Sequence, residues 1–113
     1  MNEGLKSAAT TWTQCVDLLT AARPILAKLD PNVGPVLYND IKGHMENLTA
    51  ELANLSQCVT KTVALMDEGN PAKVEEWTDN SLLAAQDSFN VAEDLARLIR
   101  ARIQNHGLSG PWA

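Results

Sequence analysis

Aromatic residues are scarce in this chain of 113 residues, at 4% of the total. Strands of β-sheets draw on aromatic and β-branched side chains, so this scarcity, together with abundant Ala and Leu, favours helices. Apolar residues make up 45% and charged residues 20% of the chain, a balance that excludes extensive disorder. The length fits a single domain that is large enough to bury a core.

Basic residues and long apolar runs are also lacking. The net charge is −5, and non-specific binding to nucleic acid or anionic lipid needs a basic surface, so we expect neither partner. No run approaches the roughly 18 consecutive apolar residues of a transmembrane helix, and the first residues lack the basic flank and apolar core of a secretory signal. We therefore expect a cytoplasmic location, with signal-independent secretion as the open alternative.

Motifs for catalysis and metal binding are absent from the sequence. It contains no Gly-x-Ser-x-Gly, no phosphate-binding glycine loop and no His-Glu-x-x-His. His44 and His106 are the only histidines, and neither has a Cys or His three or four residues further on, so zinc binding is not expected. The carboxylates fall on polar faces and are interpreted as solvated surface. We expect no enzyme activity, no cofactor and no metal.

The two cysteines, Cys15 and Cys58, are too far apart for a disulfide within one chain. If the first two predicted helices pair in an antiparallel arrangement, the cysteines are offset by roughly eight residues, about 12 Å along the axis. We interpret both as small buried hydrophobic residues. A bridge between two chains is the alternative.

The strongest pattern is an unbroken alternation of three- and four-residue steps between residues 38 and 66. This spacing keeps one stripe of a helix against a partner helix through four heptads. The residues between the stripe positions are mostly polar, so the opposite face is solvated. The predicted core stripe consists of Tyr38, Ile41, Met45, Leu48, Leu52, Leu55, Val59, Thr62 and Met66.

Proline and glycine divide the chain into three long helices. They cluster at 30–35 and at 69–71, and these two segments are interpreted as connections. Pro24 falls inside the first helix and is expected to kink it rather than to end it. The helices are predicted over about 3–29, 35–67 and 71–106.

The third helix carries an apolar stripe of its own. Its small residues allow helices to approach closely, or leave space for a ligand. Trp12 of the first helix is assigned to the core by its heptad position, as is Trp77. The stripe of the third helix consists of Val74, Trp77, Leu82, Ala85, Phe89, Ala92, Ala96, Ile99 and Ile103.

Three helices of similar length predict an all-α fold, an antiparallel three-helix bundle with shallow crossing angles. Residues 1–108 form the single predicted domain, and residues 109–113 a short flexible C-terminal tail. The apolar stripes of the second and third helices are wide, so we expect a homodimer that completes a larger bundle.

Charge is distributed unevenly along the predicted rod. Part of this charge separation follows from helix dipoles, which favour acidic residues early and basic residues late in a helix. The remaining charge separation would allow an acidic partner to bind at the basic end, or copies of the rod to stack head to tail. The acidic residues near the junction of the second and third helices are Asp67, Glu68, Glu75, Glu76 and Asp79. The basic residues at the other end are Arg23, Lys28, Lys42, Arg97, Arg100 and Arg102.

Trp112 follows Gly110 and Pro111 in the tail. An exposed tryptophan beside an arginine-rich helix end would be a suitable anchor for a partner protein. Folding of the tail back over the bundle is the alternative. The candidate partner-binding residues are Trp112, Arg97, Arg100 and Arg102.

These features favour a non-enzymatic protein–protein interaction module, such as an adaptor, a regulator, an inhibitor or an assembly subunit. Its expected partner is a protein, including a second copy of the chain. The alternative is a carrier or sensor of small molecules with an apolar cavity between the helices, where Ala85, Ala92 and Ala96 leave room.

Overall fold

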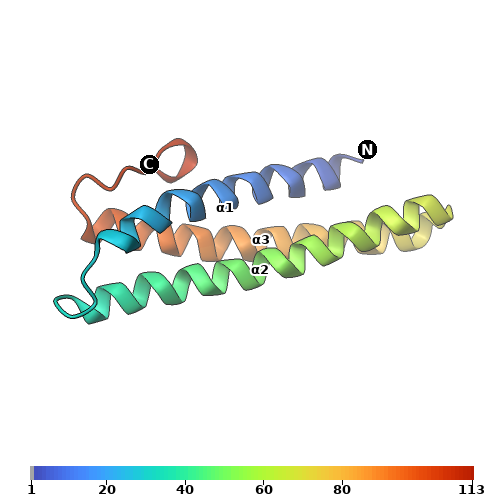
Figure 1. The fold of residues 1–113 in the computed structure, drawn as a ribbon. Helices are drawn as coiled ribbons and strands as arrows, with labels where there is room; N and C mark the ends of the chain where they lie inside the picture. Colours follow the sequence, from blue (N-terminus) through green and yellow to red (C-terminus); the bar gives the residue numbers. More distant parts are fainter. Residues whose placement is uncertain (1) are drawn as a thin grey trace.

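The computed structural model describes residues 2–113, and its three long helices run alternately up and down a narrow rod (Figure 1). Helix α1 spans Glu3–Lys28, α2 spans Pro35–Glu68 and α3 spans Pro71–Arg102, followed by a 3-10 helix, η1, at Gly110–Trp112. These residues include no strand, and each helix packs against the other two. The predicted all-α three-helix bundle is confirmed.

Local chemistry sets most of the helix boundaries. Asn2 and Asn70 each cap a helix, because their side chains accept a hydrogen bond from the backbone N–H three residues later. Pro35 and Pro71 lie in the first turn, where a missing N–H costs nothing. Gly69 ends α2 at φ 70°, a conformation that favours glycine. Helix α1 continues through Pro24 as one element. The kink expected there stays a prediction.

Helix α3 ends at Arg102, earlier than the predicted residue 106. Ile103 leaves the helix with φ −121° and ψ 114°. Asn105 and Gly107 then take left-handed φ values of 58° and 69°. Two such residues in close succession turn the chain back along the bundle, and Leu108 becomes buried. A left-handed φ is uncommon outside glycine, and asparagine is one of the few other residues that adopt it.

The predicted core stripe of α2 is buried in its middle, with half-buried members such as Tyr38, Met45 and Val59. The prediction that Met66 belongs to the core stripe is wrong, because its side chain is 40% exposed while that of its neighbour Leu65 is 3% exposed. After Leu55 the buried residues of α2 are Cys58, Thr62 and Leu65, in steps of three, four and three residues. The inward positions predicted at Val59 and Met66 therefore lie one residue earlier, at Cys58 and Leu65. The fully or nearly buried members of the stripe are Ile41, Leu48, Leu52, Leu55 and Thr62.

The buried residues of α3 are mostly small, whereas those of α2 are mostly leucine and isoleucine. Ala92 and Ala96 of α3 are fully buried. Thr62 and Ser81 bring their hydroxyl oxygens within 3.3 Å of each other across the two helices, and each also donates to a carbonyl of its own helix. Leu82, predicted to lie in the α3 stripe, is 36% exposed instead.

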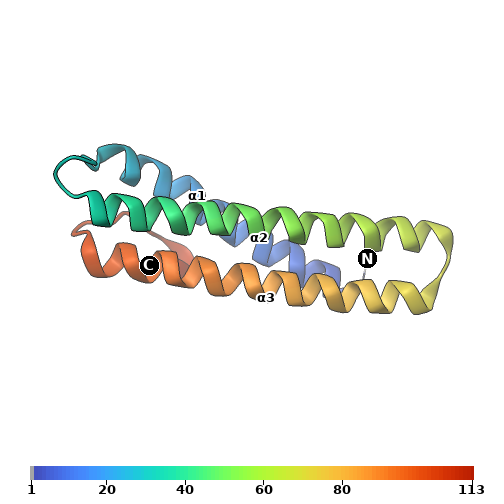
Figure 2. The same ribbon diagram turned by 90° about the horizontal axis from the view of Figure 1, so that it is seen from below.

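Helix α1 crosses the α2–α3 pair obliquely (Figure 2). Its C-terminal end lies beside α2, and its N-terminal end lies over α3. Two contacts hold the N-terminal end there. The Asn2 amide donates a hydrogen bond of 3.1 Å to the Thr78 hydroxyl, and Gly4 allows close approach, since a Cβ at Gly4 would lie 2.5 Å from the Thr78 methyl. The tilt of α1 opens a groove between α1 and the second half of α2.

Candidate interaction surface

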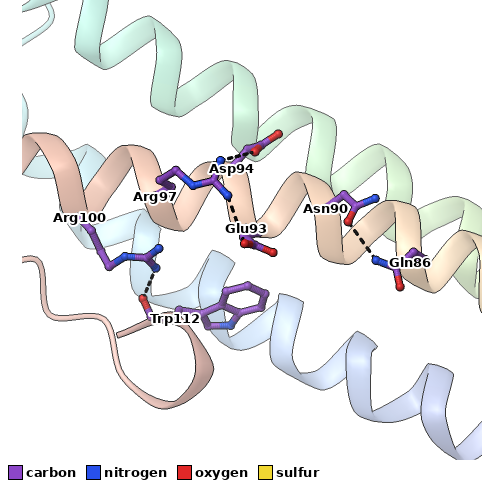
Figure 3. Close-up of polar contacts among 7 residues, drawn as sticks. All are labelled: Gln86, Asn90, Glu93, Asp94, Arg97, Arg100 and Trp112. Atoms are coloured by element: carbon purple, nitrogen blue, oxygen red, sulfur yellow. Dashed lines mark hydrogen bonds and ion pairs between the residues drawn. The ribbon is translucent and has the colours of Figure 1, made fainter.

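The tail that follows α3 packs against the bundle, in contrast to the predicted flexible tail (Figure 3). Trp112 is only 4% exposed. Its indole N–H donates to the Gln14 carbonyl of α1 at 2.9 Å, and its ring centroid lies 5.3 Å from that of Phe89 in α3. The tail therefore folds back over the bundle, which was the alternative to an exposed partner anchor.

The predicted arginine cluster is divided among different contacts. Arg100 donates to the Trp112 carbonyl at 2.7 Å and so holds the tail in place. Arg97 contacts Glu93 at 3.1 Å and Asp94 at 3.4 Å on its own helix (Figure 3). Exposed pairs of this kind contribute little to stability. Arg102 is exposed at the end of α3.

A more distinctive surface is the groove between α1 and α2. A hollow of about 290 Å³ lies in it, open to solvent. Trp12, which the heptad pattern assigned to the core, is 37% exposed at its edge. Trp12 was wrongly predicted to be buried, because the oblique path of α1 leaves this position without a covering helix. The lining residues are Ala8, Ala9, Trp12 and Thr13 of α1 and Leu55, Ser56, Val59 and Thr60 of α2.

A second, separate hollow lies nearer the α1–α2 connection. It is lined by Leu26 of α1 and by Lys42, Met45, Glu46 and Thr49 of α2. The two hollows lie between α1 and α2, one beside residues 42–49 and the other beside residues 55–60 of α2. We call the two hollows together the α1–α2 groove.

The middle of the α1–α2 groove is free of charge. Residues 7–16 of α1 and 52–60 of α2 contain no Asp, Glu, Lys or Arg. The exposed Thr13 donates its hydroxyl proton to the Ala9 carbonyl at 3.1 Å, which reduces the polarity of the surface it presents. Concave, uncharged surfaces with a partly exposed tryptophan resemble the centres of protein interfaces, which are depleted of charge.

The two ends of the rod differ in charge as the sequence predicted. The acidic residues Asp67 and Glu68 end α2 beside the start of α3, and Lys42 lies near the opposite end of α2. All three side chains are exposed. The charged ends therefore flank an uncharged middle.

Within residues 2–113, no group of three His, Cys, Asp or Glu side chains is arranged to hold a metal ion. The His44 Nδ1 lies 2.7 Å from the Asp40 carbonyl, and the His106 Nδ1 accepts from the Leu108 N–H. Both histidines thus make local backbone contacts.

Cys15 and Cys58 are buried and free, which agrees with their interpretation as small buried hydrophobic residues. Burial removes water from the thiol of Cys15 and raises its pKa from 9.0 to about 11. Such a thiol stays protonated and unreactive at neutral pH.

The alanines expected to leave a ligand cavity fill the helix contacts instead. Ala92 and Ala96 are fully buried, and Ala85 is 5% exposed beside an open hollow between α1 and α3. In the part of the chain that the structure describes, no helix is long and apolar enough to cross a membrane. Comparison of the chain with protein-family models, with curated proteins and with solved structures gives no match.

Proposed function

We propose that this protein is a non-enzymatic protein–protein interaction module, an adaptor, regulator or assembly subunit that binds a helix of its partner in the α1–α2 groove. The observation that carries the proposal is the position of Trp12, a large side chain 37% exposed beside an uncharged hollow. Tryptophan in a concave apolar setting is the residue most enriched among those that dominate binding energy.

The shape and chemistry of the groove suit an amphipathic helix. Two antiparallel helices form its walls, and a third helix laid between them would bury its apolar face as in other helix-in-groove complexes. Ala9 is exposed and small enough to let a helix approach closely, and the half-buried Val59 adds apolar area on the α2 side.

The expected compartment is the cytoplasm. Two free cysteines suit a reducing environment. The net charge of −5 disfavours nucleic acid as the partner. These properties support a protein partner.

Site-specific photo-crosslinking in the cells that produce the protein tests this function. A photoreactive residue at Thr13 lines the groove. The same residue at Thr10 is the matched control, because Thr10 is also an exposed threonine of α1 that donates to the carbonyl four residues earlier. We expect a protein adduct from position 13 and none from position 10. Equal yields, or no adduct from position 13, would contradict the proposal.

A further inference from the structure

We infer that the occupant of the α1–α2 groove is a second copy of this chain, with the α2 helices of the two copies packed antiparallel against each other. The inference rests on the proposed function, since it names the partner of the same surface. It is argued from the pattern of charge along α2, from the position of the groove and from the small residues at its centre.

One exposed stripe of α2 runs from Lys42 to Asp67, and it includes lining residues of both hollows of the groove between Lys42 and Thr60. These two residues are 25 positions apart, which at about 100° per residue is within about 20° of seven full turns. Lys42 and Asp67 therefore lie on the same face of the helix. We call this set the exposed α2 stripe: Lys42, Glu46, Thr49, Ala53, Ser56, Thr60, Val63 and Asp67, all exposed or lining the groove.

The charges at the two ends of the exposed α2 stripe are opposite in sign. Within one chain Lys42 and Asp67 are separated by about 38 Å, so they do not pair with each other. In an antiparallel copy, Lys42 faces the partner's Asp67, and the symmetric pair forms at the other end. A parallel copy would place like charges opposite each other. Charge complementarity thus selects the antiparallel arrangement.

The centre of the stripe coincides with the groove. The midpoint between Lys42 and Asp67 falls at residues 54 and 55, and Leu55 and Ser56 line the uncharged hollow. A two-fold axis through this point makes the same patch face itself, which is the usual form of a homodimer interface. The interface core then combines two bands without charge, while its charged residues lie at the rim.

Small residues at the centre allow the two α2 helices to approach closely. Thr49, Ala53, Ser56 and Thr60 follow one another in steps of four, three and four residues. In the two-fold arrangement Ala53 faces the partner's Ser56, and Thr49 faces the partner's Thr60. Trp12 stands beside this contact and covers the incoming helix from the α1 side.

Sedimentation equilibrium of the purified chain tests the inference. We expect a species of twice the chain mass of 12.3 kDa. Ser56→Glu places a charge in the groove and should raise the dissociation constant by about tenfold or more. Gln57→Glu is the matched control, because Gln57 is the adjacent exposed residue and is not part of the groove lining. It should leave the dissociation constant within about twofold. A monomeric wild type, or equal effects of the two substitutions, would overturn the inference.

A charge exchange tests the orientation. Lys42→Glu and Asp67→Lys should each weaken the homodimer, by about fivefold at low ionic strength. An equimolar mixture of the two variants should form a heterodimer of wild-type affinity, because both rim pairs again join opposite charges, one as in the wild type and one with reversed sign. If Asp67→Lys alone leaves the affinity unchanged, or the mixture gains nothing, the antiparallel contact is refuted.

The two proposals fail in different ways. If the purified chain is monomeric and Thr13 forms an adduct with a different protein, the homodimer is contradicted and the proposed interaction function stands. Absence of any Thr13 adduct, together with a monomeric chain, would remove both.

Discussion

Replacing Trp112 by alanine should destabilise the whole bundle, although the residue lies next to the C-terminus of the chain. The side chain is 4% exposed, contacts Phe89 and donates to the Gln14 carbonyl of α1. The tail therefore links α3 to α1 on the side away from α2. Trp112→Ala removes this link and leaves the rest of the sequence intact.

The magnitude follows from the buried area and the lost hydrogen bond. Burial of a tryptophan removes about 150–250 Å² from water, or about 4–6 kcal/mol at 25 cal/mol per Å² as an upper bound. The indole hydrogen bond adds about 1 kcal/mol. Release of the tail restores conformational freedom to several residues and offsets part of this loss. We expect a decrease of about 3–4 kcal/mol in the free energy of unfolding.

Urea unfolding followed by helical circular dichroism measures this change. Trp112→Phe is the matched variant, because it keeps an aromatic ring beside Phe89 and removes the indole N–H donor to Gln14 together with part of the buried ring area. It should cost about 1–2 kcal/mol. If Trp112→Ala changes the free energy of unfolding by less than about 0.5 kcal/mol, the tail does not hold the bundle together and the reasoning is refuted.

Two further predictions concern glycines and Cys15. The new methyl group of Gly43→Ala in α2 would meet nothing within 4 Å, so this substitution should stabilise the fold by about 0.5–1 kcal/mol. The new methyl group of Gly4→Ala would lie 2.5 Å from the Thr78 methyl, so this substitution should destabilise the fold by about 1–2 kcal/mol. Thermal unfolding of both variants measures this contrast, and equal shifts would contradict the close α1–α3 contact. The pKa of the Cys15 thiol is raised from 9.0 to about 11, so its stabilising contribution is complete below pH 9 and is lost between pH 9 and 11. Between pH 9 and 11 the free energy of unfolding of the wild type should fall by about 3 kcal/mol relative to that of Cys15→Ala. If the difference in free energy of unfolding between the two proteins stays constant over this interval, burial does not shift the pKa of this thiol.

Helices and turns were predictable because their signals are local. Asn70, Pro71 and Gly69 lie next to the boundaries that they set, and the core stripe of α2 recurs within each turn. The errors in burial have a different origin. Met66 was misplaced because the strict heptad was extended to the end of α2, whereas the buried residues there are Thr62 and Leu65, three residues apart.

The interaction surface was less predictable because it depends on contacts between distant residues. Trp12 has the spacing of a core residue, but it is exposed in the structure. The N-terminal end of α1 contacts Thr78, far along the chain, through Asn2 and Gly4, and this path of α1 has no local signal in the sequence. The position of Trp112 depends on a carbonyl at Gln14, which no sequence motif marks. The charges at the ends of α2 were visible in the sequence, but their relation to a groove was not.

Distances between spin labels in the two copies test the central claim most directly. The native cysteines are buried, so an added exposed cysteine is labelled selectively. Asn54→Cys places the label beside the two-fold axis, and Asp40→Cys places it near the start of α2.

Antiparallel packing of the two α2 helices predicts a distance of about 20 Å between the labels at position 54 and about 45 Å between those at position 40. Short distances at both positions would indicate parallel packing. Absence of any dipolar signal between the two copies would contradict the dimer.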